Sequence, residues 1–160
     1  VGGTVVEYRG GGREHCSDEI LRVFDWMGRK KRNGFPVEFS CNTMRPWDNY
    51  FWWVEVSGFP ERVVVDPKEW PAPRGTRPML VEGRISGHDT IYVKTGADSI
   101  SVWLSPELVD FTQRLSLKVN GREVSLPDSY LEPKVATILE DVRTRGDRQH
   151  PFWARVEAGK

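Results

Sequence analysis

His15 is the residue near the start of the chain whose type and setting best suit chemistry. It lies between Glu14 and Cys16, follows three glycines at 10–12 and precedes a predicted helix. An unperturbed histidine titrates near neutrality, so a loop imidazole can serve as a general base. The alternative, ordinary polar surface, is the more common state of a loop histidine. A Cys–His pair with Cys16 is disfavoured because catalytic pairs are usually distant in sequence.

A nucleophile for this histidine is not evident. A serine nucleophile normally occupies a G-x-S-x-G elbow between a strand and a helix, and the sequence contains no such pentapeptide. In the nearest string, residues 83–87, Ser86 stands one place late and lies between two predicted strands. We therefore interpret Ser86 and His88 as turn residues. A triad of His15, Ser86 and an aspartate is an alternative without further support.

Metal-ligand spacing is also missing. The three histidines, His15, His88 and His150, are isolated, and the sequence has neither H-x-x-x-H nor C-x-x-C spacing nor an EF-hand loop. The sequence therefore predicts no metal site and no cofactor. An oxygen-ligand calcium site in a loop, with Asp89 or Asp98, remains an alternative.

Seven tryptophans in 160 residues are the unusual feature of the composition. Large aromatic side chains usually fill a core, but some could form a surface on which a sugar stacks. Trp52 and Trp53 are neighbours on a predicted strand, so they should point to opposite faces. Tyr92 and Trp103 are out of phase with the buried residues of their strands, so we expect them to share an outer face. These four are the candidate substrate-binding residues, although burial is the favoured interpretation.

Charge and hydropathy exclude two classes of partner. Lys plus Arg (23) balance Asp plus Glu (23), whereas a protein that binds nucleic acid usually has a basic excess. No apolar run approaches the roughly 18 residues of a spanning helix. We therefore expect neither a nucleic acid nor a membrane partner.

Periodicity predicts the elements that must position these residues. Val5–Tyr8 reads as a strand, and a helix is predicted from Ser17 to about Asn33. The apolar stripe of this helix has the spacing i, i+3, i+4, i+7 and consists of Ile20, Val23, Phe24 and Met27.

From residue 37 the period changes to that of strands. The predicted strands are 37–41, 50–56, 63–65, 80–85, 90–95, 99–104, 115–120, 122–126 and 152–156. Asn120-Gly121 predicts a type I′ hairpin turn. A helix is predicted over Glu132–Arg145, with Val135, Ile138, Leu139 and Val142 on one face.

The predicted fold class is α+β, mainly β. A strand–loop–helix unit occupies 1–34, and an antiparallel β-sandwich-like domain with one C-terminal helix occupies 37–160. The first unit is too small to bury its own helix stripe. We expect it to lean on the β domain or on a partner.

The motifs together resemble a known family. The segment VEYRGGGREHCSDEILRVFDWMGRKKR is similar to the last strand, histidine loop and last helix of bacterial α/β-hydrolase-type serine peptidases and esterases of the prolyl-oligopeptidase-like kind. The segments MRPWDNYFWWVEV, WLSPELVDF, KVNGREV and LEDVRTRGDRQHPFWARVE resemble the C-terminal β extension found on some of these proteins.

This resemblance implies a divided catalytic site. The triad of such hydrolases runs Ser, then Asp or Glu, then His, and His15 matches the histidine. The nucleophile, oxyanion hole and acid are then expected upstream of Val1, on a missing N-terminal hydrolase domain that would be the main partner. The implied function is a C-terminal accessory part of a serine hydrolase, with at most weak or unconventional hydrolysis of a small ester, lactone or amide.

Two alternatives from other classes accompany this interpretation. The first is a carbohydrate-binding accessory module that uses the aromatic residues. The second is a structural domain that packs on its own hydrolase, or self-associates as a dimer, without any activity.

Overall fold

The computed structural model describes residues 19–30, 33–66, 68, 71, 73–126 and 130–159. The chain divides into two compact units, Val1–Asn33 and Gly34–Lys160. In the first unit the described residues form helix α1 (Ile20–Gly28), so the prediction that this helix extends to about Asn33 was wrong. The predicted strand Val5–Tyr8 and Ser17, where the helix is predicted to begin, lie outside the described residues.

The apolar residues of α1 are exposed. Phe24 is 64% exposed and Met27 is 53% exposed, and no residue of this helix is buried. A helix of nine residues is marginal in water by itself, so burial of this face would stabilise it. In the part of the chain that the structure describes, neither helix is long and apolar enough to cross a membrane.

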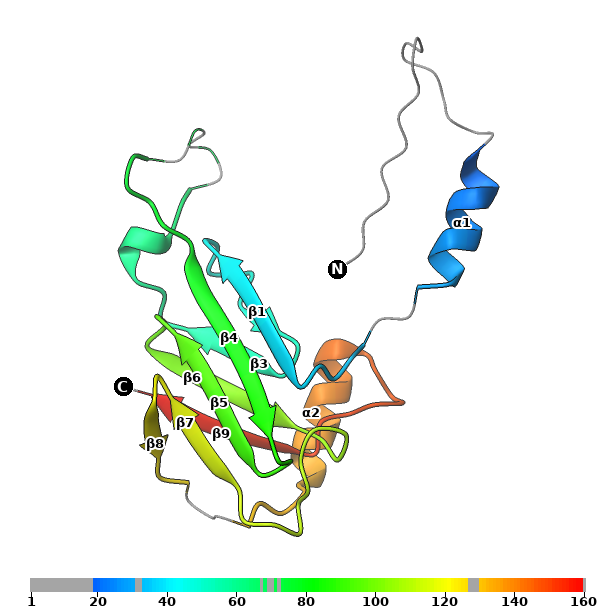
Figure 1. Ribbon diagram of the computed structural model, residues 1–160, viewed down its shortest axis with the longest axis vertical. Coiled ribbons are helices and arrows are strands. Elements are labelled where there is room, and N and C mark those ends of the chain that lie inside the picture. The colour runs from blue at the N-terminus through cyan, green and yellow to red at the C-terminus, as the bar shows by residue number, and fades with distance from the viewer. Residues whose placement is uncertain are drawn as a thin grey trace. The chain divides into compact units, whose positions relative to one another are not determined.

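The second unit is built from two β-sheets (Figure 1). The five-stranded sheet has the order β1 (Glu38–Thr43), β4 (Met79–Ser86), β5 (Thr90–Thr95), β7 (Ser116–Val119), β8 (Arg122–Val124). The four-stranded sheet has the order β2 (Tyr50–Phe51), β3 (Val54–Ser57), β6 (Ser99–Leu104), β9 (Ala154–Gly159). Helix α2 (Val135–Arg145) precedes β9 and contacts it. The predicted mainly-β fold class is confirmed.

Alternating apolar residues of the two sheets meet in one core. Val81 and Ile91 of the five-stranded sheet and Val54 and Val102 of the four-stranded sheet are each at most 1% exposed, and all belong to one buried cluster. The strand pairs are antiparallel except β5 with β7, which is parallel. This pair has the register Tyr92 to Lys118, and it places side chains of distant segments side by side.

The predicted strand over residues 50–56 is instead a tight hairpin. Strands β2 and β3 pair with Phe51 opposite Val54, so Trp52 and Trp53 form the two-residue turn. Trp52 has a φ of 52°, which costs about 1–2 kcal/mol for a non-glycine residue. The indole of Trp53 offsets this cost because it is fully buried and its Nε1 donates a hydrogen bond to the Pro36 carbonyl at 2.8 Å. Tertiary burial here overrides strand propensity.

Two other expectations differ from the structure. A strand was predicted over residues 63–65, but a 3₁₀ helix spans Glu61–Val63 after Pro60. The C-terminal helix is confirmed, yet its apolar face is largely exposed: Val135 is 71% exposed and Leu139 is 65% exposed. Only Asp141 of this helix is buried. The helix is therefore held by a polar anchor rather than by an apolar stripe.

At Gly83 on β4, two aromatic rings fill the space where a side chain would stand. Gly83 is opposite Phe39 of β1 in the same sheet. A Cβ atom added at Gly83 would lie 2.7 Å from Phe39 Cζ and 2.8 Å from Trp53 Cη2. Both aromatic rings therefore occupy space that any other residue at position 83 would need. Phe39 and Trp53 also pack edge to face, with ring centroids 5.2 Å apart.

We predict that Gly83→Ala destabilises the protein by about 1–3 kcal/mol, the usual cost of overpacking a well-packed core. The measurement is the free energy of unfolding from urea denaturation. Gly96→Ala is the matched control because its added Cβ would make an ordinary contact, 3.5 Å from Met79 Cγ. Equal stabilities of the two variants would contradict the prediction.

Candidate functional site

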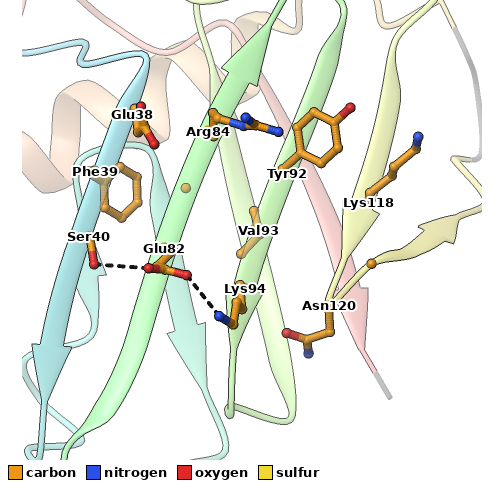
Figure 2. Close-up of a pocket in the computed structure, with 12 residues that line it drawn as sticks. Glu38, Phe39, Ser40, Glu82, Arg84, Tyr92, Val93, Lys94, Lys118 and Asn120 are labelled. Carbon is orange, nitrogen blue, oxygen red and sulfur yellow. Dashed lines mark hydrogen bonds and ion pairs between the residues drawn. The ribbon is translucent and has the colours of Figure 1, made fainter.

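A groove of about 460 Å³ crosses the outer face of the five-stranded sheet. Figure 2 shows its side chains, which come from β1, β4, β5, β7 and the turn after β7. The polar side chains among them alternate along each strand with buried residues such as Phe39, Gly83 and Val93, so the sheet presents them together on its other face. The pairing of the strands aligns these side chains in two rows that run across the sheet.

The first row is centred on Tyr92. The strand pairing places Glu38 opposite Arg84, Arg84 opposite Tyr92 and Tyr92 opposite Lys118. The guanidinium carbon of Arg84 lies 4.7 Å from the centroid of the Tyr92 ring, and Lys118 Nζ lies 5.6 Å from it. Both cations are within the range of favourable cation–π contact. The ring therefore holds two positive charges in place across three strands.

The second row is a hydrogen-bonded chain. The Ser40 hydroxyl donates to Glu82 Oε1 at 3.3 Å, and Lys94 Nζ lies 3.3 Å from Glu82 Oε2 (Figure 2). The side chains of Lys94 and Glu82 are 67% and 39% exposed, so this ion pair contributes little to stability. The pair does affect the charge of the groove, because Lys94 neutralises the Glu82 carboxylate.

Three cations, Arg84, Lys94 and Lys118, line the groove against two carboxylates, Glu38 and Glu82, so positive charge is in slight excess. Neither Arg84 nor Lys118 forms a salt bridge with any residue that the structure describes. A second hollow of about 700 Å³ shares Lys94 with the groove and adds Arg62 and Arg77 to its lining. The arrangement favours a ligand that carries negative charge.

Asn120 forms one end of the groove and fixes its shape. The Thr95 N–H donates to Asn120 Oδ1 and Asn120 Nδ2 donates to the Thr95 carbonyl, each at 3.0 Å. The side chain thus pairs with Thr95 as a strand residue would. Asn120 and Gly121 have φ values of 52° and 80° between paired strands, which confirms the predicted type I′ turn.

The structure separates the four predicted substrate-binding aromatics. Trp53 is fully buried, and Trp103 is 5% exposed with its Nε1 donating to Glu55 Oε2 at 3.1 Å. Trp52 is half-buried and packs on Phe39. Tyr92 and Trp103 do not share an outer face, because β5 and β6 belong to different sheets. Of the four, Tyr92 alone lines the groove.

His15, the predicted general base, lies outside the described residues. His88 lies in the turn after β4, in which Gly87 and His88 both have positive φ, so its interpretation as a turn residue is confirmed. Ser86 is instead the last residue of β4 and pairs with Thr90. Among the residues that the structure describes, no group of three or more His, Cys, Asp or Glu is placed to hold a metal ion.

Arg84 and Lys118 were missed by the sequence reasoning. Their side chains face outward like that of Tyr92, on the two strands next to β5. The alternation of buried residues along the sequence already indicated this orientation. The missing information was which strands are neighbours. Residues 118 and 92 become adjacent only through the parallel pairing of β5 and β7.

Comparison with known proteins identifies no relative, because no family model, curated protein or solved structure matches the chain. The resemblance to prolyl-oligopeptidase-like hydrolases therefore stays a prediction.

We predict that Asn120→Gly destabilises the protein by about 1–2 kcal/mol, because two hydrogen bonds to Thr95 are lost while glycine keeps the positive φ. Asn120→Ala should lose about 1 kcal/mol more, since alanine disfavours that conformation. Thermal and urea unfolding of the two variants measure the difference. Wild-type stability in Asn120→Gly would show that the side-chain hydrogen bonds contribute nothing.

Proposed function

We propose that the β-sandwich unit is a carbohydrate-binding accessory domain that takes an acidic sugar in the groove on its five-stranded sheet. The observation that carries this proposal is the position of Tyr92 between two cations, Arg84 and Lys118, that have no salt-bridge partner among the described residues.

The chemistry of the groove suits a sugar that carries carboxylate or sulfate groups. Arg84 presents a planar fork of donors that matches the oxygens of such groups. Ser40 and Asn120 add neutral hydrogen-bonding groups of the kind that hydroxyls need. Because the ring of Tyr92 already orders both cations, less side-chain entropy is lost on binding.

The dimensions favour an extended ligand. Neighbouring strands lie about 4.8 Å apart, so the distance from β1 to β7 is about 14 Å. The first row crosses this whole distance from Glu38 to Lys118. An acidic oligosaccharide laid across the strands would pass both cations, whereas a single small anion would use one of them.

We predict that Arg84→Gln weakens binding of a galacturonic acid oligosaccharide at least about tenfold, since hydrogen bonds to charged groups contribute about 1.5–3 kcal/mol. Arg148→Gln is the control, because it removes one exposed positive charge that does not line the groove. Isothermal titration at low and high salt measures both effects, and salt should weaken binding to the wild type. Equal affinities of the two variants would refute the groove as the binding site.

A serine hydrolase origin for the first unit is the second proposal. The exposed apolar residues of α1 support it, because a helix with this face is stabilised by packing on a partner. In this proposal the partner is a hydrolase domain, and His15 is its general base. The binding unit would then hold the substrate of that hydrolase close to its catalytic site.

We predict little or no hydrolysis of short-chain esters, lactones or peptides by this chain alone, because a general base without a nucleophile offers no acyl-enzyme route. Release of a chromogenic leaving group measures the rate. His15→Ala should show the same background rate as the wild type. A turnover that His15→Ala abolishes and His88→Ala retains would contradict the accessory role.

A further inference from the structure

A second surface site lies outside the groove, where Phe111 and Trp153 line a pocket of about 330 Å³. Their rings are nearly parallel, with an interplanar angle of 20° and centroids 6.2 Å apart. Rings in full contact lie about 3.5 Å apart, so this separation leaves much of each face uncovered by the other. Trp153 is 37% exposed. The pocket shares no residue with the groove.

Backbone hydrogen bonds hold this aromatic pair rigidly. The Trp153 N–H donates to the Leu104 carbonyl at 2.7 Å, and the Trp153 carbonyl accepts from the Lys134 N–H at 2.9 Å. On the other side, the Asp110 N–H donates to the His88 carbonyl at 2.9 Å. Leu108 and Val109 of the same segment are buried in the core. The site is therefore formed before any ligand arrives, which lowers the entropic cost of binding.

Two hydrogen-bond acceptors accompany the rings. The Nδ1 of His88 lies 3.3 Å from the Leu108 carbonyl, so in the neutral imidazole Nδ1 carries the proton and Nε2 is the acceptor. Nε2 has no hydrogen-bond partner among the residues that the structure describes. Hydrogen bonds from Thr112 and then Gln113 lower the pKa of the Asp110 carboxyl. Asp110 thus stays an acceptor over the neutral range.

We propose that this pocket binds one pyranose ring of a neutral sugar. The apolar C–H face of the ring would stack on Trp153 and Phe111, and its hydroxyls would donate to Asp110 and to Nε2 of His88. An aliphatic ligand would give no donor to Nε2 of His88, and a carboxylate or sulfate would face the negative charge of Asp110. The pocket is thus complementary to an uncharged molecule that has an apolar face and donor groups at its edge.

This inference does not rest on the acidic-sugar groove, because different residues and different forces are involved. An uncharged sugar has no net charge for salt to screen, so binding to this pocket should change little with salt, whereas binding to the groove depends on charge. The two sites can therefore be tested separately on the same 160-residue chain.

Isothermal titration of the full chain with neutral β-linked hexasaccharides of glucose, xylose and mannose tests the proposal. We expect at least one of them to bind, with an affinity that is unchanged by salt. Trp153→Ala and Phe111→Ala should each reduce that affinity at least tenfold. The control is Trp47→Ala, because Trp47 is 63% exposed and lies elsewhere, in the turn between β1 and β2.

Near-UV circular dichroism checks that the variants are folded. If Trp153→Ala is not folded, the result for Phe111→Ala decides the test. Loss of neutral-sugar binding in the Phe111 variant with normal binding of galacturonic acid oligosaccharides supports the second site. Absence of binding to all three hexasaccharides, or equal binding by the variants and the wild type, overturns it. If Arg84→Gln and Arg148→Gln bind the acidic sugar equally well, the groove proposal fails. That result does not affect the test of this second site.

Discussion

The close approach at Gly83 is the constraint on which the rest of the β unit depends. One ring from each sheet, Phe39 and Trp53, occupies the volume where a side chain at this position would stand. Because side chains alternate along a strand, an inward Gly83 turns both Glu82 and Arg84 outward. The packing inside the core therefore determines which side chains of β4 face the groove. A slip of β4 by one residue would bury both charges.

The outer face of the four-stranded sheet is closed in a different way. Trp103 points outward from β6 but is 5% exposed, because the ring of Phe152 and the guanidinium of Arg155 pack against it. Phe152 is held by Asp141 of α2, whose carboxylate accepts the Phe152 N–H at 2.9 Å and pairs with Arg145 at 2.5 Å through both oxygens.

Asp141 is 1% exposed, and breaking a buried pair of this kind by removing one partner usually costs about 3–5 kcal/mol. One consequence of this packing is the burial of the Tyr50 hydroxyl, which raises its pKa well above the usual range. The four-stranded sheet thus uses its outer face for stability. The five-stranded sheet keeps a polar outer face, and this difference is why the groove lies there.

Local pattern predicted much of this architecture. Strands β5 and β6 begin and end at the predicted residues, because strict alternation and flanking turn residues act within a few positions. The hairpin at Trp52 and Trp53 could not be predicted in this way. Its cause is a core contact with Gly83, 30 residues further along the chain, together with the bond from Trp53 to Pro36.

The candidate sites were likewise predictable only in part from local sequence pattern. Tyr92 was identified from its phase, but its partner Lys118 comes from a parallel pairing that no local pattern encodes. Phe111 and Trp153 lie in irregular segments without periodicity, and they meet only because Leu104 and Lys134 fix the backbone of Trp153. Residue type therefore indicated candidates, while strand order and loop anchoring decided which of them act together.

The two proposed sites differ in the force that each uses, and this difference bears on the accessory role that we propose. Both are open at the surface, so solvent weakens every contact that they make. Modest affinity is sufficient for a tethered module, because a short linker gives an effective concentration in the millimolar range. Charge at Arg84 and Lys118 would bring an acidic polymer to the surface rapidly. Stacking at Trp153 would then select sugar rings by shape, which charge alone cannot do.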